Sequence, residues 1–370
     1  MSSRPSYGYT ACCGYRTNAH FSTRVLSSPY DTCADAYHPF GYVLALLLEA
    51  CLRYQAGTPH PDVVHLSAHF LRGTSLAPFT VRVRTLRTGK TFANVLADFV
   101  QGEHTNVTCH LIFGVLSPST GSDASLSFTP PSPYAPRCPL ATHPSKCPTN
   151  LVPRGHWTFR SRLAAGDDPS ILARNSPDTR ARIASSSDST SSGGLESGVW
   201  LELLPDNASP SDTGNAGSSS SSKNPETPLT LTTPALAFFA DAFLPSPLLL
   251  SKSELKGLKP GWFPTVTMSV DFLHPIPPPQ TPTHASRTVG IYARTRFFTR
   301  PQSRHETYCE VWSAPSNVTS ASDRSEQADD DGRWRDEQVC LAVSTQMSLM
   351  VARNSKEGFG QQKQKDKPKL

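Results

Sequence analysis

An acidic residue interrupts an apolar stretch in the second half of the chain. Asp241 stands between two alanines in the segment 235–244, which otherwise contains only Leu, Ala and Phe. A carboxylate buried in such a segment is costly unless it has hydrogen-bonding partners. A carboxylate in a site can also take a proton from water and so make that water nucleophilic. Asp241 is therefore a candidate general base, and a solvent-facing Asp241 is the structural alternative.

Two further polar positions are candidates for the same site. Gln346 lies in the otherwise apolar predicted strand 339–351, where an inward-facing amide would need a hydrogen-bonding partner. Thr265 and Thr267 alternate on the predicted strand 264–275. Threonine is common in strands for structural reasons, so neither residue indicates chemistry by itself.

Several common catalytic motifs are absent from the sequence. It contains no P-loop, no G-x-G-x-x-G after a strand and no G-x-S-x-G nucleophile motif. The nine cysteines are irregularly spaced without a C-x-x-C pair, so we expect no metal site and no cofactor. Without a signal peptide we also expect these thiols to be reduced. These absences disfavour nucleotide hydrolysis, Rossmann chemistry and an α/β-hydrolase mechanism.

Composition limits the class of protein. The 370 residues include 34 prolines and are 37% hydrophobic, which is low for a compact chain of this length. Because the deficit is confined to Ser/Pro/Gly-rich stretches, we expect a globular core with disordered inserts at 166–194, 206–226 and 316–330.

No run of 18 apolar residues occurs, so no membrane span is expected. The net charge of +5 is spread along the chain, which argues against a nucleic-acid partner.

The first half predicts one helix and an antiparallel meander. After a loose leader, 1–16, the domain covers 17–116, and its helix, 41–54, is apolar almost all round, as for a helix buried on most sides. Its strands are predicted at 21–26, 62–71, 79–86, 92–101 and 106–116. A Pro/Ser-rich linker, 117–227, follows, and it contains strands of the second half near 156–162 and 198–204.

The same order of elements recurs in the second half, 228–353. Its helix is predicted at 234–244, and its strands at 264–275, 288–298, 306–312 and 339–351. An acidic insert, 313–338, interrupts the last hairpin, and a basic tail, 354–370, follows. The segment HLSAHFLR at 65–72 aligns with TMSVDFLH at 267–274, so the chain contains an internal repeat.

One buried helix wrapped by a curled antiparallel sheet is the hotdog arrangement. Two copies predict an α+β double hotdog, in which edge-to-edge pairing of the sheets hides an edge of each. The chain resembles the thioesterase-like superfamily and is similar to acyl-CoA thioesterase II. The resemblance rests on GYVLALLLE at 41–49, the segment 65–72 and VRTLRTGKTF at 83–92, and it covers roughly 17–116 and 233–353.

The resemblance implies hydrolysis of fatty acyl-CoA to a free fatty acid and CoA. In the family, a helix Asp, a Thr on the following strand and a Gln on the last strand hold the attacking water. The matching positions are Asp241, Thr265, with Thr267 as the alternative register, and Gln346. The chemistry fits, because a thioester carbonyl needs an activated water and donors for the developing oxyanion.

The first half predicts a degenerate site. Its helix has no Asp and only Glu49 near its end, while His65 and His110 stand in place of Thr267 and Gln346. A histidine in such a position is more often structural than catalytic.

The segment before the first helix departs from the family pattern. Many relatives have Asn-Gly-Gly there, and this chain has Pro39-Phe40-Gly41. The departure and the large inserts leave open a non-catalytic acyl-CoA-binding or lipid-binding double hotdog. A hotdog enoyl-CoA hydratase ranks third, because DAYHP at 35–39 matches the hydratase pattern Asp-x-Asn-Pro-x-His only weakly and lacks its Asn.

Acyl-CoA is the expected partner, and a homo-oligomer is left open. The candidate substrate contacts are Arg72, Lys90, Arg294 and Arg296 for the phosphates of CoA, and Phe238, Phe239 and Phe243 for the acyl chain. Solvated strand faces are the alternative for each basic residue. Without a signal peptide we expect the cytoplasm, and the ending KPKL at 367–370 keeps the peroxisome as an alternative.

Overall fold

Most of both predicted halves is described by the computed structural model. The described residues are 18–23, 40–75, 77–116, 130–150, 162–185, 195–205, 229–251, 254, 261–278, 283–299, 304–319 and 332–352.

An antiparallel sheet of 12 strands forms the frame of the molecule, in the order β1-β3-β4-β5-β2-β10-β13-β12-β11-β8-β7-β6. The strands of the first half are β1 (Asn18–Thr23), β2 (Asp62–Phe70), β3 (Phe79–Thr88), β4 (Ala93–Gln101) and β5 (His104–Gly114). The remaining strands of this sheet are β6 (Thr149–Asn150), β7 (Leu163–Asp167), β8 (Leu195–Leu203), β10 (Thr265–Phe272), β11 (Thr288–Thr299), β12 (Arg304–Ser313) and β13 (Cys340–Ser348). A second, two-stranded sheet pairs β9 (Gly261–Trp262) with β14 (Val351–Ala352).

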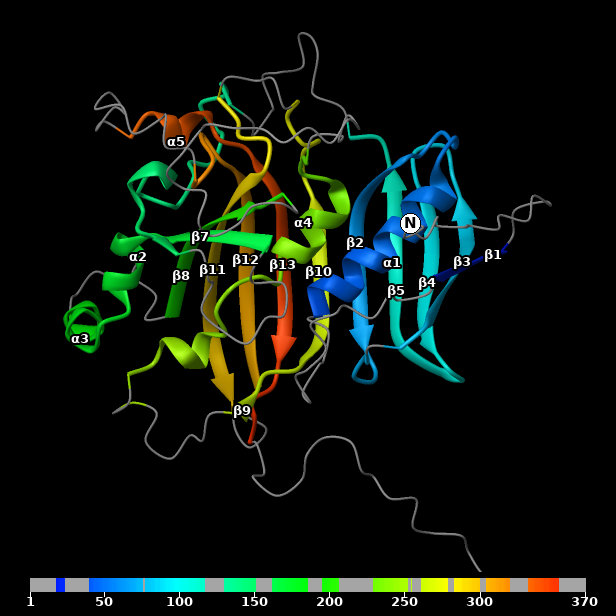
Figure 1. Ribbon diagram of the computed structural model, residues 1–370, viewed down its shortest axis with the longest axis horizontal. Coiled ribbons are helices and arrows are strands. Elements are labelled where there is room, and N and C mark those ends of the chain that lie inside the picture. Colours follow the sequence, from blue (N-terminus) through cyan, green and yellow to red (C-terminus); the bar gives the residue numbers. More distant parts are fainter. Residues whose placement is uncertain are drawn as a thin grey trace, which may run out of the picture.

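The two halves meet where β2 pairs with β10, in the middle of the sheet (Figure 1). This pairing is centred on Ser67 opposite Ser269, so it has the form of a two-fold axis through equivalent residues. Neither β2 nor β10 is therefore left as an open edge, which removes a template for unwanted strand pairing.

Strand register repeats in both halves. Ser67 lies opposite His110 in the β2–β5 pair, and Ser269 lies opposite Thr345 in the β10–β13 pair. The β-bulges also fall at equivalent places, next to His65 in β2 and next to Thr267 in β10. The internal repeat predicted from the sequence is therefore present in the backbone.

Helix α1 (Phe40–Gln55) packs on the strands of the first half. Its side chains Leu44, Leu47, Leu48 and Cys51 are fully buried, and Figure 1 shows the helix in front of β2 and β5. The helix supplies the apolar residues that the buried faces of the strands require. In β3, for example, buried valines alternate with exposed arginines.

A second layer covers the opposite face of the sheet in the C-terminal half. Along β8, Val199 and Leu201 belong to the core shared with the helices, while Trp200 between them belongs to a separate cluster. That cluster includes Trp312 and Ile171 of α2 (Pro169–Arg174). Trp334 of the short helix α5 (Trp334–Glu337) packs against this cluster, and Cys147, directly after the short helix η2 (Pro144–Lys146), belongs to it. Helix α3 (Pro177–Ser185) follows α2 and contacts it.

The expectation of disorder at 166–194 is wrong for the described residues up to 185. Ile171 is fully buried on Gly198, where an added Cβ would lie only about 2.3 Å from the Ile171 Cδ1 atom. The Asp168 side chain caps α2 by accepting from the Ser170 amide at 2.9 Å. One well-placed apolar side chain and one cap thus order a segment of polar composition.

Other expectations about the inserts have mixed outcomes. Residues 316–319 are ordered, with Val318 buried and Thr319 hydrogen-bonded to Glu202, so that part of the expectation is also wrong. The rest, 320–330 and 206–226, lies outside the described residues. Most of the strand expected near 156–162 does too, and the strand found there, β7, begins at Leu163. The strand expected near 198–204 is β8.

In the described parts of the chain, no helix is both long and apolar enough to cross a membrane. The six cysteines described there are buried and free, at 51, 109, 138, 147, 309 and 340.

Candidate active site

Asp241 lies in the turn that follows helix α4 (Thr233–Phe239) and not inside the helix, as the sequence had suggested. The predicted end at Leu244 is wrong because the chain tightens after Phe239. The Asp241 amide donates to the Phe238 carbonyl at 3.2 Å, which is an i to i−3 bond. The Ser344 hydroxyl donates to the Ala240 carbonyl at 3.0 Å. That carbonyl therefore does not need a partner from a continuing helix.

The start of α1 comes directly against Asp241. The backbone amide of Gly41 donates to the Asp241 carboxylate at 2.8 Å. A Cβ on Gly41 would lie 2.7 Å from the Asp241 Cβ and 2.8 Å from the Phe238 carbonyl oxygen. Only glycine allows the two helices to approach this closely. Of the segment that departs from the family pattern, Phe40 and Gly41 form the start of α1, with the Gly41 amide directed at the carboxylate, and Pro39 lies outside the described residues.

Gln346 and Thr265 are brought together beside Asp241. The Thr265 hydroxyl donates to Gln346 Oε1 at 2.9 Å, and both side chains are buried. With Oε1 engaged in this way, the amide nitrogen of Gln346 is the end left to donate to Asp241. The three residues predicted as a site therefore converge from three elements: the turn after α4, the start of β10, and β13.

The bulge in β10 decides between the two threonines. Register shifts between Thr265 and Thr267, so Thr265 and Met268 are both buried on the same side. Thr267 lies opposite Met347 and His69 and is half-buried. Among the described contacts, only Thr265 reaches Gln346, so the structure does not bring the alternative register to the site.

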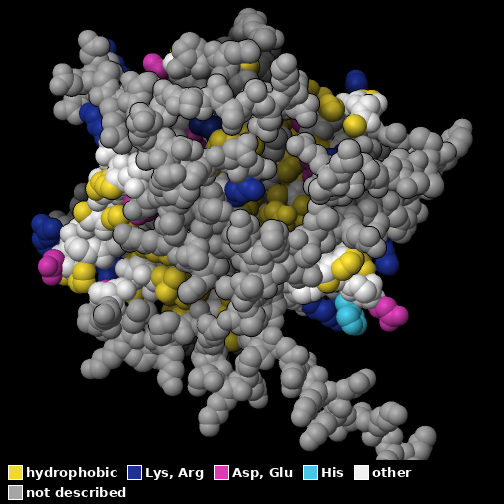
Figure 2. Space-filling model, viewed as in Figure 1, with side chains coloured by type: hydrophobic (Ala, Val, Ile, Leu, Met, Phe, Trp, Pro, Cys, Tyr) yellow, Lys and Arg dark blue, Asp and Glu magenta, His cyan; other side chains and the backbone are white. Residues whose placement is uncertain are grey.

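Asp241 is half-buried in apolar surroundings, and this changes its acidity. Loss of hydration raises the pKa of Asp241 to about 6, although the amide of Gly41 and the side chain of Gln346 each favour the charged form. Figure 2 shows hydrophobic side chains near the centre of the view, over the region where α1 and α4 lie in Figure 1. At pH 7 the carboxylate is mostly ionised and is a stronger base than an exposed aspartate.

The predicted substrate residues have different environments. Arg72 is exposed just after β2, and it donates to the Thr105 carbonyl at 3.1 Å. Phe238 is half-buried, whereas Phe239 is completely buried in the core. Arg294 lies over the ring of Tyr308.

The pairing of residues across neighbouring strands shows that Arg294 does not face the site. Arg294 and Tyr308 are paired with each other across β11 and β12, while the neighbouring row pairs Thr307 with Gln346. Side chains of successive residues on a strand point to opposite faces of the sheet, so Arg294 points away from the face that carries Gln346. Lys90 is exposed in the turn after β3. Nothing is described for the Arg296 side chain.

Sequence reasoning missed Ser344 and an aromatic group at the start of α1. Phe40 packs edge-on against Phe70, with ring centroids 4.8 Å apart, and stacks on Trp262 at 6.4 Å. Trp262 lies three residues before Thr265, and nothing in the sequence around it indicated a role at the site. Ser344 could have been found from its spacing, because it is two residues before Gln346 and so faces the same side of β13.

The equivalent positions of the first half are apolar. By the shared register, Val63 corresponds to Thr265, and Leu111 corresponds to Gln346. The predicted counterpart of Gln346, His110, is wrong by one residue, because it is equivalent to Thr345. His65 faces outward and contacts Asp271 Oδ1 at 2.6 Å across the junction of the two halves.

Comparison with known proteins agrees with the fold and the motifs. Residues 29–114 match the family model of the acyl-CoA thioesterase N-terminal domain. The chain resembles the acyl-CoA thioesterases, as its motifs predicted. No curated protein matches the chain in sequence.

Solved structures share its architecture. A hotdog protein of unknown function from Alicyclobacillus acidocaldarius is 17% identical, with a TM-score of 0.53 over 93% of this chain and 97% of its own. A protein of Thermobifida fusca YX, provisionally described as a thioesterase II, is 19% identical, with a TM-score of 0.54 over 90% and 92%. Acyl-CoA thioesterase II TesB2 from Mycobacterium marinum is 13% identical, with a TM-score of 0.50 over 85% and 89%. At these identities the likeness shows a hotdog fold.

Proposed function

We propose that the protein is an acyl-CoA thioesterase that hydrolyses fatty acyl-CoA with a water held by Asp241, Gln346 and Thr265. The observation that carries the proposal is the setting of Asp241, whose half-buried carboxylate has a pKa of about 6 and is fixed by the amide of Gly41. A base in that range is ionised at neutral pH and still accepts protons well. The likeness of residues 29–114 to acyl-CoA thioesterase domains supports the substrate class.

In this mechanism Asp241 takes a proton from water as the water oxygen attacks the thioester carbonyl. The tetrahedral intermediate collapses, the carbon–sulfur bond breaks, and the CoA thiolate takes the proton back from Asp241. Free fatty acid and CoA leave, and no covalent enzyme intermediate forms. The Gln346 amide orients the water, and Thr265 holds that amide in position through the 2.9 Å bond to Oε1.

We further propose that each half is one hotdog, with 17–116 as the silent copy and 228–353 as the catalytic copy. The repeated register and bulge support this division. The apolar positions Val63 and Leu111 support the silent role of the first copy.

The test is turnover of acyl-CoA thioesters from butyryl to palmitoyl, followed with a thiol-trapping reagent that reports free CoA. Release of CoA with at least one chain length is expected. Binding of acyl-CoA without release would overturn the proposal in favour of a non-catalytic binding protein. Hydration of an enoyl-CoA, measured in parallel, would instead indicate a hydratase.

A further inference from the structure

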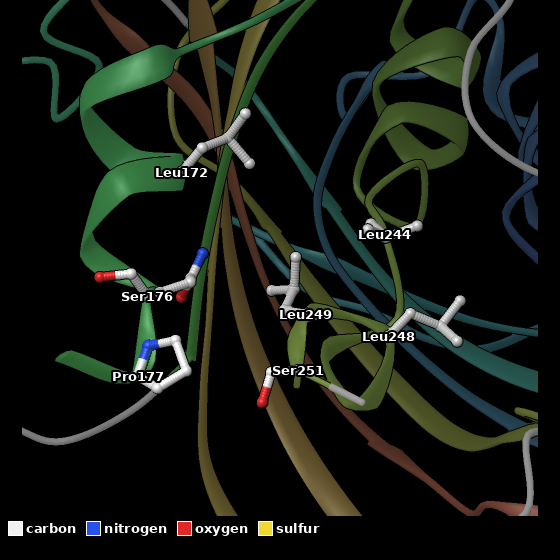
Figure 3. A pocket seen from close by; sticks show the side chains of 8 residues that line it. Leu172, Ser176, Pro177, Leu244, Leu248, Leu249 and Ser251 are labelled. Carbon is white, nitrogen blue, oxygen red and sulfur yellow. The ribbon is translucent and has the colours of Figure 1, made fainter. Parts of the chain in front are cut away.

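A cavity of about 280 Å³ lies between α2–α3 and the segment that follows Asp241. Its volume is just below the range of small-molecule sites, which run from about 300 to 1,000 Å³. Leu172 of α2 forms one wall, and Leu244, Leu248 and Leu249 form the other. Figure 3 shows these leucines on the two sides of the gap, with Leu172 on α2 and the others on the chain opposite.

The polar side chains of the cavity are already occupied by the protein. Asn175 pairs with the backbone of β8, donating to the Glu196 carbonyl at 2.6 Å and accepting from its amide at 3.0 Å. The Ser176 hydroxyl donates to Thr179 at 2.7 Å, and the Ser251 hydroxyl donates to Glu254 at 2.7 Å. A ligand in this cavity would therefore meet leucine methyl groups and no unsatisfied polar partner, which selects for a hydrocarbon.

Both walls are tied down. Ser246, two residues before Leu248, is buried with its hydroxyl against Thr295, which in turn contacts Thr307 at 2.9 Å. An ion pair between Arg180 of α3 and Glu254 joins the two sides of the cavity. The described walls of the cavity are thus fixed by hydrogen bonds and by an ion pair that joins them.

The cavity is also close to the candidate base. Leu244 is three residues from Asp241, and three residues span at most about 10 Å even when fully extended. A fatty acyl chain whose thioester sits at Asp241 is long enough to cover that distance.

We propose that this cavity receives the distal end of the acyl chain and so sets the chain length that the enzyme prefers. The inference rests on the proposed function, since it takes Asp241 as the point from which the chain extends. It assigns chain-length selection to Leu172, Leu244, Leu248 and Leu249 in place of the phenylalanines of α4. Phe239 is unsuited to that role because it is completely buried in the core.

The experiment compares the wild type with Leu248→Trp, which fills the cavity from a position that is 42% exposed and needs no rearrangement of the core. Each methylene kept out of the cavity should cost about fourfold in affinity. We expect kcat/KM for palmitoyl-CoA to fall at least about tenfold, while the value for butyryl-CoA stays within about twofold. Leu172→Trp, from the opposite wall, should give the same pattern. Leu86→Trp, at a 47% exposed position on β3, is the matched control and should change neither substrate.

Equal losses for short and long chains, or the same length dependence in Leu86→Trp, would overturn the inference. Binding of non-hydrolysable S-alkyl-CoA thioethers provides a readout that does not need turnover. The wild type should bind the palmityl thioether more tightly than the butyl thioether, and Leu248→Trp should abolish that difference. If the protein binds the two thioethers with this difference but hydrolyses no acyl-CoA, the proposed function is contradicted and the role of the cavity in binding the chain is supported. If it hydrolyses acyl-CoA but the tryptophan variants change neither binding nor turnover, the proposed function is supported and the role of the cavity is contradicted.

Discussion

The two halves of the sheet share one strand register and carry different side chains on it. Where the second half places Thr265 and Gln346, the first half places Val63 and Leu111, and all four are buried. The backbone thus accommodates either an apolar pair or a hydrogen-bonded polar pair at the same two points. Polarity at these positions is not required for the fold, which makes its presence in one half a sign of chemistry.

The acidic residues of the two helical segments differ in the same way. Glu49, inside α1, is partly exposed and pairs with Arg53 at 2.6 Å, one turn further along the helix. Asp241 is turned inward and held by Gly41 of the other half. A carboxylate on a solvated helix face costs little free energy. A carboxylate buried among apolar side chains has a raised pKa and needs hydrogen-bond donors to stay ionised.

The largest effect is expected from removing the candidate base. Asp241→Asn should lower acyl-CoA hydrolysis about 10²-fold or more, because the amide keeps the size of the side chain but cannot accept the proton. Circular dichroism should show that the variant is folded. Glu49→Gln is the control from the other half and should leave the rate nearly unchanged. Full activity in Asp241→Asn with loss in Glu49→Gln would place the working site in the first half.

Copying the first half into the second tests the comparison directly. Gln346→Leu and Thr265→Val introduce the side chains found at Leu111 and Val63. Each should reduce kcat about 10- to 100-fold, and the double variant should lose less than the product, because the two residues act as a unit. Thermal unfolding should show little loss of stability, since the first half packs with these residues. Strictly multiplicative losses would mean that the two side chains act separately.

The acidity of Asp241 predicts a dependence of stability on pH. Because its pKa is raised to about 6 in the folded protein, from about 3.9 in an unfolded chain, ionisation opposes folding. The penalty is absent below pH 4, grows as pH rises through 6, and reaches at most about 3 kcal/mol above it. Asp241→Asn should therefore be more stable than the wild type at pH 8 and equal to it at pH 3.5. Chemical denaturation at both pH values measures this, and a deficit in the variant at pH 8 would contradict the account.

The smallest expected effect concerns a positioning residue. Ser344 holds the Ala240 carbonyl at 3.0 Å, and its first-half equivalent is Cys109. Ser344→Ala should reduce kcat severalfold with little change in KM, because one buried hydrogen bond is lost and the turn bearing Asp241 loosens. Ser344→Thr keeps the hydroxyl and should restore most of the rate. The pH midpoint of kcat should move in Ser344→Ala, and a merely structural role would leave it in place.

Much of this arrangement could be predicted from residue patterns. Alternation along strands such as β3 and the recurrence of 65–72 at 267–274 were enough to indicate two related halves. The three site residues could be proposed only with the family resemblance, because threonine and glutamine carry little signal on their own. The structure then brought them together around a carboxylate that composition alone had marked as unusual.

The errors came from effects that a local pattern does not contain. The predicted helix 234–244 followed an apolar segment up to the proline at 245, whereas the hydroxyl that accompanies the end of α4 comes from β13, which is distant in sequence. The equivalence of His110 with Gln346 failed by one residue, because register is set by strand pairing. The bulge in β10, which the sequence also does not show, is what separates Thr265 from the alternative Thr267. The helices of 169–185 depend on the fit of Ile171 over Gly198, which composition does not show.

The contact between Gly41 and Asp241 has an evolutionary consequence. When a gene is duplicated and fused, one copy is usually free to decay once the other performs the reaction. Here the backbone of the first half, which we propose to be the silent copy, supplies a donor to the candidate base Asp241 of the second half. On that proposal the first half stays under selection at Gly41, where a single methyl group would collide with its neighbour. On the same proposal, the second half could not work as a separate domain, because part of the support for its base comes from the first.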